Sequence, residues 1–500
     1  MSNGTLGSSD RLLSTSLSRR RFLHAGGAAA LGLALPGWLG GCASHPIHPA
    51  PPWAELKRSL RGGLLLPGDP GFAMRAQPWA LQYASRTPEA IATCANEDDV
   101  RTALGWAERH EVPLVARSGG HSYAGNSTTT GLMIDVAKIN SVEIDPDSGV
   151  ARLGGGARNR NVYAACRPFS RAVTHGRCKE VGVAGLVLGG GIGFNMRLHG
   201  LTCDGLTGTR VVLANGDVAV CNASENADLF WACRGAGGGN FGIHTEFTFQ
   251  TFPVGDYTIF DITWSDPTVA LFDALQALSL SAPETLGLKL SVVARAGAPE
   301  LVLNILGQNA GDETSVRSLF APAFAIRKPD SARIETLPYW DAQEILSEQG
   351  DPEYSHERSR FAHGALSTDA IRTVFDNLKA WPGTTLAATW KFFLMGGRIA
   401  AVSPDATAFL QRDASMITSI ELEWTPQDPA EQVARNQAWL DRFHDAMARY
   451  TSTYSYVNFI DPAQRDYLHA YYGDHLPRLR EVKRRRDPRN VFHYPQSIPV

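Results

Sequence analysis

The sequence predicts an α+β protein with a boundary near residue 255, and three observations lead to this. Its 500 residues, 44% of them hydrophobic, suffice for two or three domains with a large core. Short apolar runs bounded by turns occur in the same chain as helical patterns. Glycine clusters are dense as far as Phe252 and sparse from 256 to 450, where strands with flanking helices favour an α+β second domain.

Charge, cysteines and motifs exclude several functions. The formal net charge of −3 gives no global field that would attract nucleic acid or an anionic membrane. Seven cysteines occur without a CxxC pair, so no metal site is predicted, and the sequence assigns no disulfide pairs. The sequence has no GxSxG, HExxH or P-loop motif, so hydrolase and kinase functions lack their chemistry.

The amino terminus, residues 1–44, resembles a twin-arginine export signal. Arg19 and Arg20 stand in the run SRRRFL, and the uncharged run 25–41 that follows is too short and too weakly apolar to span a membrane stably. The twin-arginine export machinery carries folded proteins, often with a cofactor already inserted. We therefore expect a cofactor-bearing protein that is exported to the periplasm or the cell envelope.

Processing of this signal has two alternatives. Leu39–Cys42 looks like a lipoprotein cleavage box, after which Cys42 would carry a lipid and anchor the protein to a membrane. The other alternative is ordinary cleavage near Ala43 or Ser44, without an anchor. Residues 45–79 then form a tether, which begins with the proline-rich run HPIHPAPP, and a lead-in to the fold.

The first elements follow from apolar runs and helix caps. Residues 90–94 predict a short strand, and Asn96 caps a helix that runs to about His110 with acidic residues in its first turn. Pro168 ends a further predicted helix over 159–166. Three more strands are predicted over 113–117, 131–136 and 150–156.

Two glycine-rich stretches carry the strongest signal for a ligand. The run ARSGGHSYAGNS, 116–127, places His121 in a glycine turn, and 174–193 holds seven glycines around Cys178 and an apolar run. Glycine permits positive φ and close backbone approach, and successive free N–H groups form a cradle for an anion. These stretches predict a dinucleotide phosphate site. The alternatives are a tight glycine turn in a β-rich core and a hydrogen-bonded loop histidine.

A Rossmann site is excluded at both places where glycines suggest one. Gly237, Gly239 and Gly242 satisfy GxGxxG, but 243–252 alternates like a strand where the dinucleotide motif needs a helix. In the earlier glycine-rich stretch, Phe194 stands where the last glycine should be. A dinucleotide is therefore expected to bind in another manner.

Further elements follow from turn and cap signals. Asn215-Gly216 lies among alternating apolar residues and predicts a type I′ hairpin over 208–221. Asp266 and Pro267 predict a helix start, as N-cap and first helical residue. The basic run Glu481–Arg489 predicts a solvated helix face and no nucleic-acid site, because no interleaved aromatic residues accompany it. The other predicted elements are helices over 266–280, 369–381 and 429–450 and strands over 288–294, 300–307 and 386–394.

Five segments of the chain are informative in combination. They are RSGGHSYAG, GRCKEVGVAGLVLGGGIG, HGLTCDGL, DLFWACRGAGGGNFGI and NVFHYPQSIP, which begin at residues 117, 176, 199, 228 and 490. Together they resemble the berberine-bridge-enzyme-like FAD-linked oxidases, flavoproteins of the vanillyl-alcohol-oxidase type with a PCMH-type FAD-binding domain. The resemblance implies an FAD domain over 80–255 that the C-terminal segment 451–500 completes, and a substrate domain with an antiparallel sheet inserted at 256–450.

The resemblance also implies that FAD is attached covalently at two residues. The family's histidine falls on His121, which would bond to the 8α position of the ring, and its cysteine falls on Cys178, which would bond to the 6 position. A doubly tethered ring suits an open cleft and a bulky substrate. The other implied FAD-binding residues are Arg117, Ser118, Gly119, Gly120, Ser122, Gly182, Val183, Gly185, Gly189, Gly190, Gly193, Gly242, Ile243 and Asn458.

Two tyrosines are candidates for the catalytic base. The family's Y-x-N block falls on Tyr456 to Asn458, where the tyrosine takes the hydroxyl proton in many oxidising members, and Tyr454 is a weaker candidate. Free tyrosine titrates near ~10, so the site would have to stabilise the phenolate. The alternative is a pair of packed strand tyrosines. Gln411 departs from a histidine that related bacterial sequences often carry, so no substrate contact is inferred there.

The resemblance therefore implies an exported oxidase. It would oxidise an alcohol or a sugar hydroxyl, of a small molecule or an oligosaccharide, by hydride transfer to FAD, and O2 would reoxidise the flavin to give H2O2. One alternative is a flavin dehydrogenase that uses another electron acceptor. The other is a non-catalytic flavin-binding protein.

Overall fold

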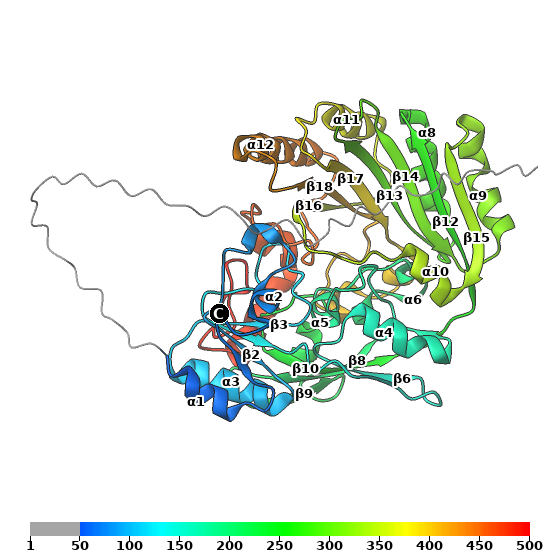
Figure 1. Cartoon of the computed structure of the whole chain (residues 1–500). Coiled ribbons are helices and arrows are strands. Elements are labelled where there is room, and N and C mark those ends of the chain that lie inside the picture. Colours follow the sequence, from blue (N-terminus) through cyan, green and yellow to red (C-terminus); the bar gives the residue numbers. More distant parts are fainter. Residues whose placement is uncertain (1–50) are drawn as a thin grey trace, which may run out of the picture. The chain divides into compact units, whose positions relative to one another are not determined.

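The computed structural model describes residues 51–500, which form one compact unit (Figure 1). The predicted export signal, Cys42 and the first part of the tether lie outside the described residues. Within the described part of the chain, no helix combines the length and the apolar character that a membrane crossing requires.

The first sheet has four strands in the order β1-β2-β4-β3. Its strands β2 and β3 both run parallel to β4, and helix α3 (Glu97–Arg109) connects β2 to β3. The Asn96 side chain accepts a hydrogen bond from the Asp99 N–H at 3.0 Å, which confirms the predicted cap. The strands are β1 (Leu64–Leu65), β2 (Ala90–Thr93), β3 (Leu114–Arg117) and β4 (Leu132–Asp135).

The second sheet has five antiparallel strands in the order β5-β6-β10-β8-β9. Strand β10 starts directly after Gly242, which confirms that the GxGxxG run leads into a strand. The strands are β5 (Val142–Ile144), β6 (Val150–Gly154), β8 (Leu206–Val212), β9 (Val218–Asn222) and β10 (Ile243–Gln250). Two further short strands, β7 (Arg171–Ala172) and β11 (Phe252–Pro253), pair with each other as a separate antiparallel sheet.

The hairpin between β8 and β9 has a different turn from the predicted one. A type I′ turn needs positive φ at both central residues, but only Gly216 (φ 82°) has it, and Asn215 does not. The Asn215 side chain instead accepts a hydrogen bond from the Asp217 N–H at 3.1 Å. Because this side-chain contact closes the loop, the hairpin prediction is confirmed and its type I′ assignment is wrong.

The third sheet is the largest and has seven antiparallel strands in the order β15-β12-β14-β13-β17-β18-β16. Its strands fall between residues 256 and 424, whereas those of the other sheets fall between 64 and 253. The boundaries at 255 and 450 stay a prediction. The strands are β12 (Asp256–Ser265), β13 (Leu286–Arg295), β14 (Val302–Asn309), β15 (Ser331–Pro338), β16 (Tyr354–Ala362), β17 (Ala387–Leu394) and β18 (Met416–Trp424).

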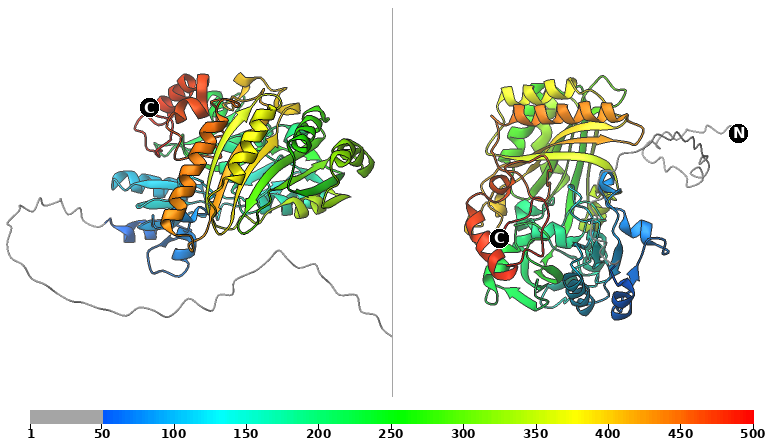
Figure 2. Two further views of the ribbon diagram at one scale, coloured as in Figure 1. Left: turned by 90° about the horizontal axis from the view of Figure 1, so that it is seen from above. Right: turned by 90° about the vertical axis from the view of Figure 1, so that its left-hand side faces the viewer.

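The two faces of the seven-stranded sheet differ in chemistry, because side chains alternate along each strand. One face is apolar, with Leu290, Trp390 and Ile420 in a core that also holds residues of the covering helices. Figures 1 and 2 show these helices along the sheet. They are α8 (Val269–Ser281), α9 (Glu313–Ile326), α11 (Thr368–Lys379) and α12 (Ala430–Met447). The other face carries polar residues and is described with the site.

Helix α8 begins two residues later than the cap signals predicted. Asp266 has φ 46°, a left-handed conformation that cannot serve as the extended backbone of an N-cap. Thr268 is extended, and its side chain accepts a hydrogen bond from the Leu271 N–H at 3.2 Å. Pro267 therefore precedes the cap, and the prediction of Asp266 and Pro267 as the helix start is wrong.

The C-terminal segment returns to the first half of the chain through α13 (Tyr467–Tyr472) and α14 (Leu476–Arg486), and α14 packs on α7 (Ala227–Ala232). Lys483 is fully buried in α14 and donates to Asn240 O at 2.7 Å, Asp487 Oδ2 at 2.8 Å and Phe492 O at 2.6 Å. The predicted solvated basic face is thus wrong at Lys483, because its ammonium has three buried acceptors.

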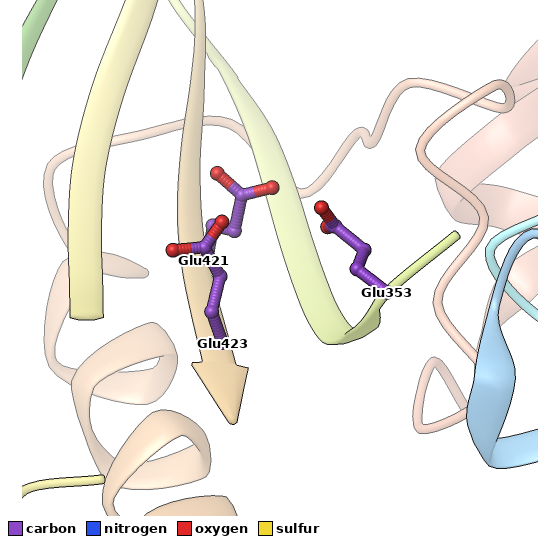
Figure 3. A group of neighbouring side chains, drawn as sticks. All are labelled: Glu353, Glu421 and Glu423. Carbon is purple, nitrogen blue, oxygen red and sulfur yellow. The ribbon is translucent and has the colours of Figure 1, made fainter. Parts of the chain in front are cut away.

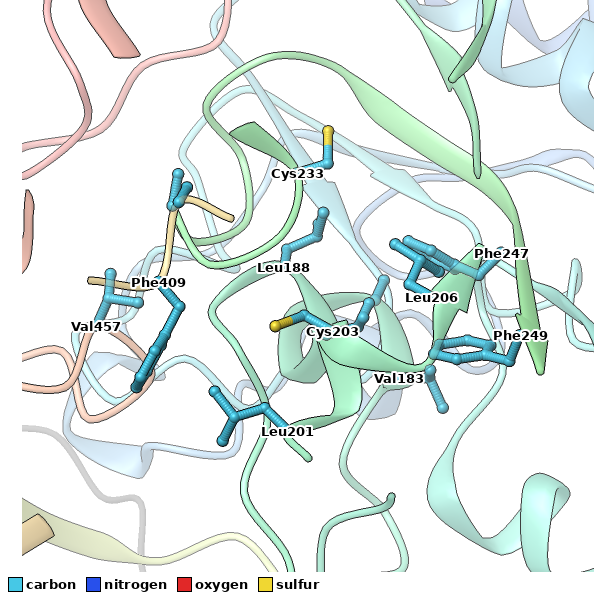
Figure 4. Close-up of a cluster of buried hydrophobic side chains, with 14 of the residues drawn as sticks. Val183, Leu188, Leu201, Cys203, Leu206, Cys233, Phe247, Phe249, Phe409 and Val457 are labelled. Carbon is cyan, nitrogen blue, oxygen red and sulfur yellow. The ribbon is translucent and has the colours of Figure 1, made fainter. Parts of the chain in front are cut away.

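The main core connects segments that are far apart in sequence. Figure 4 shows Leu188, Phe247, Phe409 and Val457 in one buried cluster, which therefore includes the C-terminal segment. The shorter helices are α1 (Trp53–Ser59), α2 (Phe72–Ala76), α4 (Asn159–Cys166), α5 (Val183–Leu188), α6 (Met196–His199), α7 (Ala227–Ala232) and α10 (Tyr339–Leu346). Mixed helices and antiparallel sheets confirm the predicted α+β fold.

Candidate active site

His121 and Cys178 come from loops almost sixty residues apart and flank a single backbone position. His121 lies in the loop after β3, and Cys178 lies in the segment before α5. Gly350 stands between them, with φ 78°. A Cβ atom added to Gly350 would lie 3.2 Å from His121 Cε1 and 3.2 Å from Cys178 Cβ. The fold therefore brings together the two predicted attachment residues.

The loop that holds His121 presents a run of free backbone donors. Within residues 51–500, no N–H group from Gly119 to Ala124 donates a hydrogen bond to a protein acceptor. Gly120 adopts φ 79°, which lets the loop turn sharply. Successive free N–H groups form a cradle that suits a phosphate or another anion. This cradle lies in the same loop as the imidazole of His121.

The polar side chains of this loop hold the loop itself. Arg117 is buried, and its Nε donates to Ser127 O at 2.9 Å. Burial lowers the pKa of Arg117 to about 10, so the guanidinium stays charged near neutral pH. Ser118 Oγ donates to Gly155 O at 2.8 Å, and Ser122 Oγ accepts from the Asn126 N–H at 3.0 Å. Cofactor contact by Arg117, Ser118 and Ser122 stays a prediction.

Most of the predicted cofactor-binding glycines are pressed against protein atoms. A Cβ atom on Gly119 would lie 2.2 Å from Gly182 N, so these two loops touch through their backbones. A Cβ atom on Gly189 would lie 2.1 Å from Asn458 Oδ1, and one on Gly193 would lie 2.0 Å from His175 O.

Gly190, with φ 110°, packs on Phe409, whereas a Cβ atom on Gly185 would meet nothing within 4 Å. At Gly189, Gly190 and Gly193 the missing side chain makes room for protein atoms, and a cofactor contact at these glycines stays a prediction. Val183 is buried in the main core at the start of α5.

Gly242 and Ile243 lie where β10 begins. A Cβ atom on Gly242 would lie 2.5 Å from Val211 Cγ1, so the glycine permits close packing on β8. Ile243 is buried in the core of the four-stranded sheet with Ile134. A cofactor contact at these two residues stays a prediction.

Tyr456 is buried, and its hydroxyl oxygen is held by two donors. Gly191 N–H and Asn458 Nδ2 each donate to Tyr456 Oη at 3.0 Å. Asn458 Nδ2 also lies 2.9 Å from Leu186 O, so Asn458 connects the C-terminal segment to α5. Burial raises the pKa of Tyr456, and the two donors only reduce this rise. The donors favour the phenolate, but the described residues place no cation on Tyr456 Oη.

Two other tyrosines lie near the C-terminal segment. Tyr454 stacks on His469 of α13, with ring centroids 4.9 Å apart. Tyr123 stacks between Trp79 (5.0 Å) and Phe459 (5.6 Å). Burial, with Glu357 and Glu421 nearby, raises the pKa of Tyr123 well above its ordinary value. Sequence reasoning missed Tyr123, although its position two residues after His121 in the same loop was a usable signal.

The polar face of the seven-stranded sheet supplies charged residues that sequence reasoning did not identify. Lys391 of β17 lies 2.7 Å from Glu421 Oε2 and 3.1 Å from Glu357 Oε1. Burial lowers the pKa of Lys391, but the two carboxylates outweigh burial and raise it, so Lys391 is a fixed cation. No local motif announces this face, because strand pairing assembles it.

Cys178 touches this charged face through Glu348. Cys178 Sγ donates to Glu348 Oε2 at 3.4 Å, and Arg177 Nη2 donates to Glu348 Oε1 at 2.6 Å. Burial and then Glu348 raise the pKa of Cys178 to about 12, so the thiol is protonated near neutral pH. Although burial opposes it, Arg177, Lys289 and Lys391 lower the pKa of Glu348 to about 2.

Gln411 is buried beside Arg412. Both Arg412 Nη atoms donate to the Asp204 carboxylate at 2.8 Å. This buried pair connects the loop before β18 to the HGLTCDGL segment. The region around Gln411 therefore has a structural contact, and nothing supports a substrate contact there.

Comparisons with known proteins now identify the family. An FAD-binding-domain model matches residues 88–222, and a model described as berberine and berberine-like matches residues 455–499. An uncharacterised FAD-linked oxidoreductase of Bacillus subtilis (strain 168) is 33% identical over 453 residues, which cover 89% of this chain and 98% of the relative. The chain belongs to the berberine-bridge-enzyme-like FAD-linked oxidoreductases.

Solved structures agree with this assignment. Physcomitrella patens BBE-like 1 is 26% identical, with a TM-score of 0.81 over 89% of this chain and 98% of that one. The glucooligosaccharide oxidase from Acremonium strictum is 26% identical, with a TM-score of 0.75 over 87% of this chain and 96% of that one. That oxidase carries a 6-S-cysteinyl, 8α-N1-histidyl FAD. The predicted berberine-bridge-enzyme-like fold is confirmed, and FAD is the cofactor.

The residues of this FAD-linked oxidoreductase fit the cofactor. The free N–H groups from Gly119 to Ala124 suit the negative charge of a pyrophosphate. Burial lowers the pKa of His121 to about 3, which keeps its imidazole neutral and able to form a bond through nitrogen. The Cys178 thiol lies across Gly350 from it. His121 and Cys178, whose side chains can each bond to a flavin, thus both lie next to Gly350.

Proposed function

We propose that this oxidoreductase holds FAD covalently through His121 and Cys178 and oxidises an alcohol or a sugar hydroxyl, with O2 as the electron acceptor. The observation that carries the proposal is the placement of both residues around Gly350. The glucooligosaccharide oxidase from Acremonium strictum supports it, since its FAD has the same two types of attachment. Acceptance of electrons by O2 would yield H2O2.

The protein's part in the reaction is to hold the substrate and take its proton. When bound, FAD supplies the acceptor for a hydride. Tyr456 is the proposed base, because Gly191 N–H and Asn458 Nδ2 donate to its oxygen and thereby favour a negative charge on it. Tyr454 stays the weaker candidate, since it stacks on His469. The rings of Phe409 and Phe459 pack edge-on against Tyr456 and limit access of water.

We also propose that the protein is exported by the twin-arginine route. The support is the sequence alone, with paired arginines before an uncharged apolar run. The periplasm or cell envelope would then be its location, with a lipid anchor if Cys42 is processed as a lipoprotein.

Turnover with peroxide detection tests the proposed function. The purified holoprotein is supplied with sugars, oligosaccharides and secondary alcohols, and peroxide is measured. After reduction by an active substrate, we expect the flavin spectrum to recover rapidly in air-saturated buffer and to stay bleached in anaerobic buffer. Slow recovery in air together with rapid recovery on adding an artificial acceptor would instead establish a dehydrogenase. Failure of every substrate to bleach the flavin would favour a non-catalytic protein.

Gly350→Ala should reduce covalent attachment of FAD. Alanine at φ 78° is strained, and its Cβ would press on both His121 and Cys178. Gly364→Ala is the matched control, because Gly364 has φ 75° but nothing within 4 Å. We expect both variants to lose about 1–2 kcal/mol of stability, measured by urea unfolding. Intact mass should show less covalent FAD only in Gly350→Ala, and equal attachment in both variants would contradict the placement of Gly350.

A further inference from the structure

Helix α4 holds the backbone of the segment that carries Cys178. Asn159 is the first residue of this helix and is fully buried, and its Nδ2 donates to Cys178 O at 2.9 Å. One turn later, Tyr163 Oη donates to Gly176 O at 2.5 Å. Residues four apart lie on the same face of a helix, so both side chains reach the same segment. In the part of the chain that the structure describes, no other side chain hydrogen-bonds the backbone of Cys178.

The first backbone N–H groups of α4 bind this segment as well. Such N–H groups have no partner inside their own helix. Asn159 N–H donates to Val181 O at 3.0 Å, and Arg160 N–H donates to Lys179 O at 3.0 Å. Together with the two side chains, the start of α4 thus binds the carbonyl groups of four residues between 176 and 181.

A strap, residues 347–353, binds the same segment through its N–H groups. Lys179 N–H donates to Glu348 O at 2.9 Å. The far end of the strap reaches the polar sheet face, where an oxygen of Glu353 lies within 4.8 Å of two carboxylates of β18 (Figure 3). Because α4 binds its carbonyl groups and the strap binds its N–H groups, the segment around Cys178 has little freedom to move.

The amide of Asn159 carries a cost in stability. Its Oδ1 is buried and has no hydrogen-bond partner among the described residues. A buried acceptor without a partner destabilises a fold, whereas an apolar side chain of similar shape avoids that cost. Burial alone therefore does not explain an amide at this position. The hydrogen bond from its Nδ2 to Cys178 O does.

Attachment of FAD at Cys178 requires an accurately placed sulfur. The reaction replaces the S–H bond of the thiol and the C–H bond at ring position 6 with one S–C bond. The two protons and two electrons that leave pass to O2, the acceptor of the proposed function, and give H2O2. A misplacement of ~1 Å can slow such a step about 10²-fold.

We propose that Asn159 and Tyr163 are positioning residues for the attachment of FAD at Cys178. The inference rests on the proposed function, in which Cys178 forms one of the two attachments. His121 lies in another loop, and within residues 51–500 neither the Asn159 nor the Tyr163 side chain hydrogen-bonds that loop. Loss of either bond to the Cys178 segment should therefore slow attachment at Cys178 and leave attachment at His121 unchanged.

Variants with a single attachment residue test the proposal. The rate of attachment is the fraction of soluble chains whose intact mass includes FAD, followed over time after synthesis is induced. In His121→Ala, only Cys178 can attach FAD, and adding Asn159→Ala should slow attachment about 5–100-fold, the range from one lost hydrogen bond to a ~1 Å displacement. In Cys178→Ala, only His121 can attach FAD, and adding Asn159→Ala should leave the rate unchanged.

A second variant and a control complete the experiment. Tyr163→Phe keeps the ring and removes only the hydroxyl that binds Gly176 O, so it tests the proposal even if Asn159→Ala does not fold. It should also slow attachment at Cys178 alone. Asn161→Ala is the matched control, because Asn161 lies in the same turn of α4 and its Oδ1 accepts from the Arg158 N–H at 2.9 Å. This variant weakens the start of the helix and should leave both rates unchanged.

Three results would overturn the inference. The first is an unchanged rate of attachment at Cys178 in both Asn159→Ala and Tyr163→Phe. The second is equal slowing in the Cys178→Ala protein, which would show a general loss of FAD binding. The third is equal slowing by Asn161→Ala, which would show that only the stability of α4 matters. Absence of covalent FAD from His121→Ala itself would instead refute the proposed attachment at Cys178, and the inference with it.

Discussion

Replacing both His121 and Cys178 with alanine should release all of the FAD when the protein is precipitated in acid. The two side chains lie on either side of Gly350, and each would form one bond to the ring. His121→Ala and Cys178→Ala alone should each retain a yellow pellet whose intact mass includes FAD. The wild-type chain should show the same added mass, because one FAD occupies both residues.

The controls for this experiment are nearby residues of the same types. Cys166→Ala removes a buried thiol in α4, and His175→Ala removes a buried imidazole close to Cys178 in sequence. Neither should release FAD on acid treatment. Free FAD from the wild-type protein would refute covalent attachment altogether, and full retention in the double variant would show that other residues attach it.

Tyr456→Phe should lower kcat by about 10²–10⁴-fold, since it removes the proposed base. It also leaves Gly191 N–H without its acceptor and Asn458 Nδ2 with Leu186 O alone, which should cost about 1–3 kcal/mol of stability. Stopped-flow measurement of flavin reduction, with FAD content and unfolding measured on the same preparation, separates the two effects. The rate of flavin reoxidation should hardly change.

The pH profile gives a second readout for Tyr456. Burial holds the pKa of Tyr456 above its ordinary value, so the fraction of phenolate and the reduction rate should rise as pH increases. This dependence should be lost in Tyr456→Phe. Tyr454→Phe is the matched control and should keep both the rate and the profile, because Tyr454 stacks on His469. A larger loss in Tyr454→Phe than in Tyr456→Phe would reverse the assignment.

Local sequence signals predicted those helices and strands whose stability depends on residues close to one another in the sequence. Asn96 caps α3 as expected, because the cap bond joins residues three apart. The helix over 159–166 also has the predicted bounds. The wrong details at Asn215 and Asp266 have the same cause. More than one side chain can close a turn or cap a helix at a given place. The Asn215 side chain closes its turn by accepting from the Asp217 N–H, and Thr268 caps α8 in place of Asp266.

The site was predictable only where it consists of motif residues. His121, Cys178 and Tyr456 follow from short segments with distinctive composition. Lys391, Glu357 and Glu421 do not, because each stands in an ordinary strand and acquires its role from its neighbour across the sheet. Strand register is a long-range property that no local pattern in these strands encodes.

The sequence by itself determined the family and the cofactor and selected His121 and Cys178 as the candidate attachment residues, because these depend on residue type and order along short segments. Only the tertiary structure decided which residue lies between His121 and Cys178. Gly350 comes from a distant part of the chain and stands between His121 and Cys178. The tertiary structure also decided that Lys483 is buried and that Asn159 holds the backbone of Cys178. The burial and the charge pairing of a side chain depend on all the residues near it in space. They are therefore decided only when separate segments of the chain pack together.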